Sequence, residues 1–124
     1  MPTVMVVDDE TVLSEVISML IEDLGYEPII ATNGAEAIDM LCSGRPLPAL
    51  IVSDVMMPRL NGIELVKRIR ADPLLADIPV ILMSAAASAT IPTVHFLPKP
   101  FDLEELADLI VYYVAESGRQ EQGA

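Results

Sequence analysis

The amino-acid sequence predicts an α/β domain whose helices cover both faces of a doubly wound parallel sheet. Short runs of β-forming residues alternate with helical patterns along the whole chain. The strand candidates are continuously apolar, as expected for strands buried on both faces. The length of 124 residues is typical of one domain with one core. We therefore predict a single domain over residues 1–117 and a polar, frayed tail over residues 118–124.

The strands are predicted from short apolar runs that are rich in the β-forming residues valine and isoleucine. The five predicted strands are Thr3–Val7, Pro28–Ala31, Ala49–Ser53, Val80–Met83 and Val94–Leu97.

The helices are predicted from apolar residues at helical spacing and from residues that favour helix ends. Gly25 supplies a stop for the first helix. Asn33 followed by Glu36, and Asp102 followed by Glu105, are capping pairs that open the second and the last helix. The predicted helices are the segment from Val12 to Leu24, Ala35–Cys42, Gly62–Arg70 and Leu103–Ala115.

Composition excludes several classes of protein. The net charge of −12 argues against nucleic acid and anionic membranes as partners, because both attract lysine and arginine. Cys42 is the only cysteine, which excludes a disulfide framework and a cysteine zinc site, and we expect it to be a small core residue. The N-terminus lacks the basic region of a signal peptide, and the uncharged segment 78–98 is interrupted by prolines. We therefore predict a cytoplasmic protein.

Polar residues follow the predicted strands where a parallel sheet binds its ligands. Asp8 and Asp9 follow the first strand, Asp54 the third, Ser84 the fourth and Lys99 the fifth. Singly, the aspartates fit a helix cap or a turn, but their joint placement at one sheet edge favours a site. Crowded carboxylates repel each other unless a cation is bound, and an all-oxygen cluster suits Mg²⁺ or Mn²⁺. The ammonium and hydroxyl groups would suit an incoming phosphoryl group.

Four segments together resemble the receiver (CheY-like) domains of bacterial two-component response regulators. They read VMVVDDE, IVSDVMMPRLNGIEL, VILMSA and FLPKPFDLEEL, and they extend from the first strand to the last helix. The resemblance implies a flavodoxin-like, five-stranded sheet of order 2-1-3-4-5, with residues 1–117 as the receiver domain.

The resemblance also implies roles for individual residues. Asp54 would be the phosphoacceptor. Mg²⁺ would bind Asp9, Asp54 and the backbone carbonyl of Met56 directly, and Asp8 through water.

A second group would respond to the phosphoryl group. Lys99 would neutralise it, Ser84 would hydrogen-bond one of its oxygens, and Phe96 would fill the space behind Ser84. The Lys99–Pro100 bond is expected to be cis. This group would be the conformational switch.

The sequence departs from the family between the fourth and fifth strands. Only residues 85–93 remain for this crossover, whereas a strand–helix–strand crossover needs at least about 10–12 residues. We therefore expect a shortened or missing fourth helix.

The function implied is that of a single-domain response regulator. It would accept a phosphoryl group from a histidine kinase or phosphotransfer protein and signal to a downstream protein, catalysing only its own phosphorylation and dephosphorylation. One alternative is a binding module with a receiver fold that no longer uses phosphorylation. Another is an aspartate-nucleophile phosphatase of the haloacid dehalogenase type. That class needs a second aspartate two positions after the nucleophile, where this chain has Met56.

Overall fold

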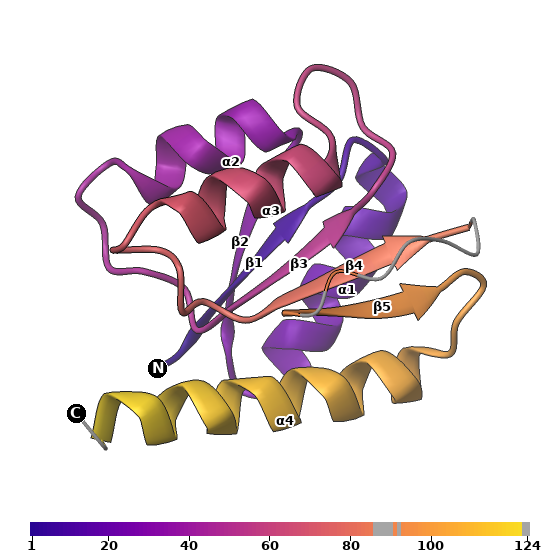
Figure 1. Ribbon diagram of the computed structural model, residues 1–124. Coiled ribbons are helices and arrows are strands. Elements are labelled where there is room, and N and C mark those ends of the chain that lie inside the picture. The colour runs from indigo at the N-terminus through magenta and orange to yellow at the C-terminus, as the bar shows by residue number, and fades with distance from the viewer. Residues whose placement is uncertain (86–90, 92, 123–124) are drawn as a thin grey trace.

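The computed structural model describes residues 1–85, 91 and 93–122, and its elements alternate as predicted (Figure 1). The strands and helices in chain order are β1 (Thr3–Val7), α1 (Thr11–Asp23), β2 (Glu27–Ala31), α2 (Gly34–Leu41), β3 (Leu50–Asp54), α3 (Gly62–Ala71), β4 (Val80–Ser84), β5 (Val94–Pro98) and α4 (Leu103–Gln122).

All strands belong to one parallel sheet of order β2-β1-β3-β4-β5, which confirms the predicted fold class and strand order. The inner strand β1 pairs with β2 on one side and β3 on the other, so that Val6 lies between Ile30 and Val52. The arrowheads in Figure 1 all point toward the same side of the molecule. The carboxyl ends of the five strands therefore meet along one edge of the sheet.

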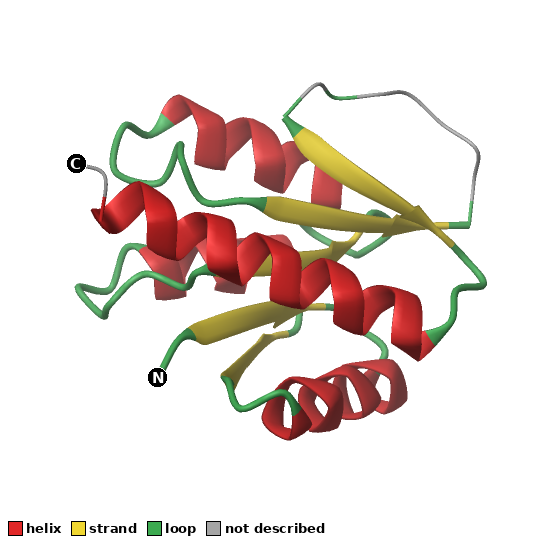
Figure 2. Cartoon of the chain, turned by 90° about the horizontal axis from the view of Figure 1, so that it is seen from below, coloured by secondary structure: helices red, strands yellow, loops and turns green. Residues whose placement is uncertain are grey.

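The sheet separates two apolar layers because successive side chains of a strand point to opposite faces. Met5 and Val7 of β1 pack with α2 and α3, whereas Val4 and Val6 pack with α1 and α4. Figure 2 views the sheet from the side of α4 and α1, with α2 and α3 behind it. The buried residues on both faces fix β1 and β3 as the rigid centre of the fold.

The helix ends follow the capping signals of the sequence. Gly25 has a φ of +91°, a left-handed conformation that glycine adopts without steric cost, and it ends α1. The side chain of Asn33 accepts a hydrogen bond from the Glu36 N–H at 2.9 Å, which confirms the predicted start of α2. α3 opens with a complete capping box between Asn61 and Glu64.

Two predictions are wrong, one about the end of the last helix and one about the burial of Cys42. α4 was expected to end at Ala115, but it continues to Gln122, through most of the expected frayed tail; residues 123–124 lie outside the described residues. Glutamate, arginine and glutamine are good helix formers, so a polar sequence does not end this helix. Cys42 is exposed rather than part of the core, because α2 ends at Leu41 and Cys42 is already its C-terminal cap.

The crossover from β4 to β5 carried the prediction of a shortened or missing fourth helix. Of its nine positions the structure describes only 85, 91 and 93, so this prediction lies outside the described residues. Across 1–85, 91 and 93–122, no helix has both the length and the hydropathy to span a membrane.

The edge strand β5 contacts α4 through a pair of aromatic side chains. The His95 Nδ1 and Tyr113 hydroxyl atoms are 3.2 Å apart. Their rings meet edge to face, with centroids 5.9 Å apart, and Tyr112 stacks edge to face on Tyr113 in turn. This contact joins the last helix to the strand that precedes Lys99.

Candidate functional site

The polar residues predicted at the strand ends lie at one edge of the sheet. Asp54 and Ser84 are the last residues of β3 and β4, and Asp8 and Lys99 directly follow β1 and β5. Asp8, Asp54 and Ser84 are 1%, 6% and 6% exposed. The strands therefore hold these three side chains inside the fold. A buried polar group needs a specific partner, whereas an exposed one can hydrogen-bond to water.

Asp54 is paired with Lys99. The Lys99 Nζ atom lies 3.3 Å from Asp54 Oδ1. The backbone of Lys99 is anchored by its N–H, which donates to the Ser84 carbonyl at 2.8 Å, and the Lys99–Pro100 bond is cis, as predicted. The last residues of β3 and β4 and the residue that follows β5 thus form a connected group.

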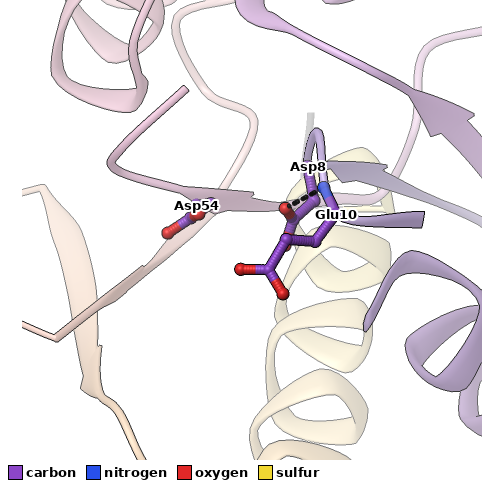
Figure 3. Close-up of side chains that lie close together, drawn as sticks. All are labelled: Asp8, Glu10 and Asp54. Carbon is purple, nitrogen blue, oxygen red and sulfur yellow. Dashed lines mark hydrogen bonds between the residues drawn. The ribbon is translucent and has the colours of Figure 1, made fainter. Parts of the chain in front are cut away.

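Three carboxylates gather beside this pair. Asp8, Glu10 and Asp54 each offer one oxygen, and these oxygens lie within 4.8 Å of one another. Figure 3 shows the Glu10 side chain reaching back past Asp8 toward the space in front of Asp54. The Asp8 Oδ1 atom accepts a hydrogen bond from the Glu10 N–H at 2.9 Å, whereas its buried Oδ2 has no partner among the described residues.

The crowding of these groups changes the acidity of Asp8. The pKa of Asp8 is raised to about 6 in total: burial is the largest cause, the Glu10 N–H and Lys99 lower the pKa, and the Asp54 and Glu10 carboxylates add to the increase. The carboxyl group therefore holds a proton more readily than an ordinary aspartate as long as no cation compensates the charge.

The chemistry of these donors fits a hard divalent cation. The group offers only carboxylate oxygens, one of them buried without a hydrogen bond, and carries more negative charge than Lys99 can balance. Mg²⁺ and Mn²⁺ prefer oxygen ligands and bind through a few carboxylates while keeping water.

The sequence of the chain matches a known family over most of its length. Residues 4–111 match the family model described as response regulator receiver domain. The chain belongs to this family. The resemblance stated from the motifs is thus confirmed.

Relatives and solved structures agree with this receiver assignment. The response regulator MprA of Mycobacterium avium (strain 104) is 36% identical over 110 residues, which cover 83% of this chain and 46% of MprA. The receiver chain thus spans about half the length of the curated relatives it matches. The Vibrio cholerae chemotaxis protein CheY4 superposes with a TM-score of 0.80 at 28% identity, covering 91% of this chain and 98% of CheY4. The receiver domain of the Francisella response regulator 1452 superposes with a TM-score of 0.82 at 30% identity, covering 94% and 99% of the two chains.

The acidic group contains one residue that was not predicted. Glu10 joins Asp8 and Asp54, whereas Asp9, the expected direct ligand, is exposed and lies outside this group of three. Glu10 belongs to the same acidic run of three residues after β1. The role of Asp9 as a metal ligand stays a prediction. The Met56 side chain is 76% exposed. Its soft thioether does not suit Mg²⁺, so only the backbone carbonyl of Met56 could be a ligand.

Phe96, the other predicted switch residue, is half-buried on β5. It packs against the apolar layer on the α2–α3 face and lies opposite Leu82 of β4. It therefore belongs to the strand next to Ser84 and stands two residues before the end of β5.

The loop after Asp54 is held by the receiver backbone itself. The Gly62 N–H donates to the Val55 carbonyl at 2.9 Å, and the Gly34 N–H donates to the Leu60 carbonyl at 3.1 Å. A Cβ atom added to Gly62 would lie 2.4 Å from the Asp54 carbonyl oxygen, so α3 can start this close to Asp54 only with a glycine there.

The raised pKa of Asp8 predicts a stability effect in the metal-free protein. Asp8 is protonated more readily in the folded state, so its favourable contribution to folding is complete below about pH 4 and is lost as the pH rises through about 6. Asp8→Asn should therefore raise the free energy of unfolding by about 1–3 kcal/mol at pH 8 in a chelator, and by less at pH 5. Urea titrations at the two pH values measure this.

The matched control is Asp9→Asn, which removes the same charge from an exposed side chain. It should change stability by less than about 0.5 kcal/mol. An Asp8→Asn protein that is less stable than the wild type at pH 8 would contradict the argument.

Proposed function

We propose that this receiver domain accepts a phosphoryl group on Asp54 from a histidine kinase or phosphotransfer protein and thereby switches its contact with a downstream protein. The observation that carries the proposal is the position of Asp54, buried at the end of β3 between the Lys99 ammonium and the carboxylates of Asp8 and Glu10. The net charge of −12 favours a protein partner over nucleic acid, and we place the reaction in the cytoplasm.

The transfer itself needs one nucleophile. A carboxylate oxygen of Asp54 forms a bond to phosphorus while the bond from phosphorus to the donor's imidazole nitrogen breaks. The product is an acyl phosphate on Asp54. The ring nitrogen keeps the electron pair of the broken bond, and the imidazole leaves as the neutral base because its other ring nitrogen carries a proton. Lys99, 3.3 Å from Asp54 Oδ1, would offset the charge of the carboxylate first and of the phosphoryl oxygens afterwards.

Mg²⁺, with Mn²⁺ as a substitute, would supply charge neutralisation for the phosphoryl oxygens when bound. The residues placed to hold it are Asp54, Asp8 and Glu10, and the family resemblance adds Asp9 and the Met56 carbonyl. Asp8 contributes a buried oxygen that has no other described partner, which supports a role in the cation site.

The switch would use Ser84 and Phe96. Ser84 lies at the end of β4, next to Asp54 in the sheet order, so its hydroxyl could move to donate to a phosphoryl oxygen. Phe96 is half-buried on the neighbouring strand and could follow that movement by repacking. A new local charge would thus be converted into a change at the β5 surface.

The experiment that tests this function is phosphorylation with a small donor. The purified chain is incubated with Mg²⁺ and acetyl phosphate, and its intact mass is followed over time. We expect one phosphoryl adduct that requires Mg²⁺ and disappears in Asp54→Asn, because an amide cannot act as the nucleophile. Asp9→Asn and Glu10→Gln, assayed in parallel, decide which of the two acids the cation needs.

Two outcomes would contradict the proposal. A folded protein that binds Mg²⁺ but forms no adduct would favour the binding module that does not use phosphorylation. Continuous release of inorganic phosphate from an added phosphoester, dependent on Asp54, would favour a phosphatase.

A further inference from the structure

Arg70, in the last turn of α3, connects three separate parts of the chain. Its Nη1 donates to the carbonyls of Ala76 and Ile78, at 3.0 and 2.7 Å. Its Nε donates to the Thr93 hydroxyl at 3.0 Å and its Nη2 to the Thr93 carbonyl at 2.9 Å. Burial lowers the pKa of the guanidinium, against the attraction of Asp77. These are therefore partly desolvated, charge-assisted hydrogen bonds, the strong kind.

The position of Thr93 gives this contact its significance. Thr93 directly precedes β5, and β5 directly precedes Lys99. Among the described strands, β5 lies at the edge of the sheet and pairs with β4 alone, so fewer hydrogen bonds fix it than fix the inner strands. Arg70 holds the beginning of β5, and Lys99 stands at its end beside Asp54.

The other end of α3 reaches the same site. α3 begins at Gly62, whose N–H is bonded to the Val55 carbonyl and whose Cα lies against the Asp54 backbone. A continuous chain of contacts thus runs from Asp54 through α3 to Arg70, then along β5 to Lys99 and back to Asp54.

We propose that Arg70 is a positioning residue of the phosphorylation site, which fixes β5 through Thr93 and thereby sets the position of Lys99 relative to Asp54. The inference rests on the proposed function. A displacement of a charged group by about 1 Å can cost about 100-fold in rate, so a contact far from the chemistry can control it.

The test compares Arg70→Lys with Arg68→Lys. Lysine keeps the charge, but a single ammonium cannot reach the two loop carbonyls and both Thr93 oxygens together. Arg68 is an exposed neighbour on the same helix and receives the same substitution as a control. We expect Arg70→Lys to slow phosphorylation by acetyl phosphate about 5- to 10-fold with less than about 2-fold change in Mg²⁺ affinity, and Arg68→Lys to change neither.

A double-mutant cycle separates positioning from general destabilisation. In a Lys99→Ala background, Arg70→Lys should slow the reaction by less than about 2-fold, because its target is already absent. If Arg70→Lys does not fold, Thr93→Val, which removes one of the four acceptors, serves in the same cycle with an expected slowing of about 2- to 3-fold.

The outcomes distinguish the two proposals. A wild-type chain that forms no adduct overturns the proposed function and the role of Arg70 with it. A phosphorylated wild type with an unchanged rate in Arg70→Lys overturns the role of Arg70 alone. An equal slowing by Arg70→Lys in the wild-type and Lys99→Ala backgrounds also overturns the role of Arg70 alone.

Discussion

Replacing Lys99 by alanine is expected to slow phosphorylation of Asp54 about 100-fold or more, because it removes the one described cation paired with that carboxylate. The ammonium is already positioned in the resting protein, 3.3 Å from Oδ1, and so needs little reorganisation as charge develops on the phosphoryl oxygens. Initial rates of adduct formation with acetyl phosphate, followed by intact mass, measure the effect. Mg²⁺ affinity should not fall, because the carboxylates keep their charge.

Lys67→Ala is the matched control, since it removes an exposed lysine from α3. Its rate should match that of the wild type. A Lys99→Ala protein that is phosphorylated within about 3-fold of the wild-type rate would contradict the assigned role of the ammonium.

Gly62→Ala is expected to lower the free energy of unfolding by about 2–4 kcal/mol and to impair phosphorylation. The added Cβ would meet the Asp54 carbonyl oxygen at 2.4 Å and Val55 Cα at 2.9 Å. Both are backbone atoms, so the clash can be relieved only by moving α3 away from the residue that we propose is phosphorylated. Urea denaturation and the adduct assay measure the two effects.

Gly118→Ala, within α4, provides the control for this substitution. An added Cβ there meets nothing within 4 Å, so the usual preference of helices for alanine should raise stability by about 0.5–1 kcal/mol. Equal effects of the two substitutions would show that the contact at Gly62 is easily relieved.

Asp54 shows why so much of the fold could be predicted. An apolar run ending in a carboxylate predicts a buried strand whose last residue lies at the binding edge of a parallel sheet, and β3 ends at Asp54. The same two rules, that continuous apolar runs form buried strands and that ligands bind at the carboxyl ends of parallel strands, also located Ser84 and Lys99. Continuous apolar strands and capped helices allow few arrangements of the chain. The sheet order was implied by the family resemblance and agrees with these patterns.

The acidic group was harder to predict. Asp8, Asp9 and Glu10 are adjacent and chemically similar, and the turn between β1 and α1 decides which of them face Asp54. That turn depends on the hydrogen bond from the Glu10 N–H to Asp8 Oδ1, a detail that composition and spacing do not specify. The sequence therefore located the acidic group but did not single out Glu10 as part of it.

Arg70 could not have been singled out from the sequence. In the sequence of α3, Arg70 resembles its neighbours Lys67 and Arg68, because all three are basic residues near the C-terminal end of the helix. Its hydrogen-bond partners lie up to 23 residues away in the sequence and are mostly backbone carbonyl oxygens. Every residue has a backbone carbonyl, so residue types do not indicate these contacts. Only the structure separates this arginine from the exposed ones.

The edge-to-face contact of Tyr113 with His95 offers an intrinsic spectroscopic probe of β5. The chain has no tryptophan and three tyrosines, so ultraviolet emission comes from Tyr26, Tyr112 and Tyr113 alone. Two of these emitters lie on α4, and one touches the residue beside Phe96. A rearrangement of β5 would change the surroundings of Tyr113, whereas Tyr26, next to β2 on the other side of the sheet order, would contribute a constant background to the summed emission. Light emitted by the unlabelled chain would then record the switch in real time.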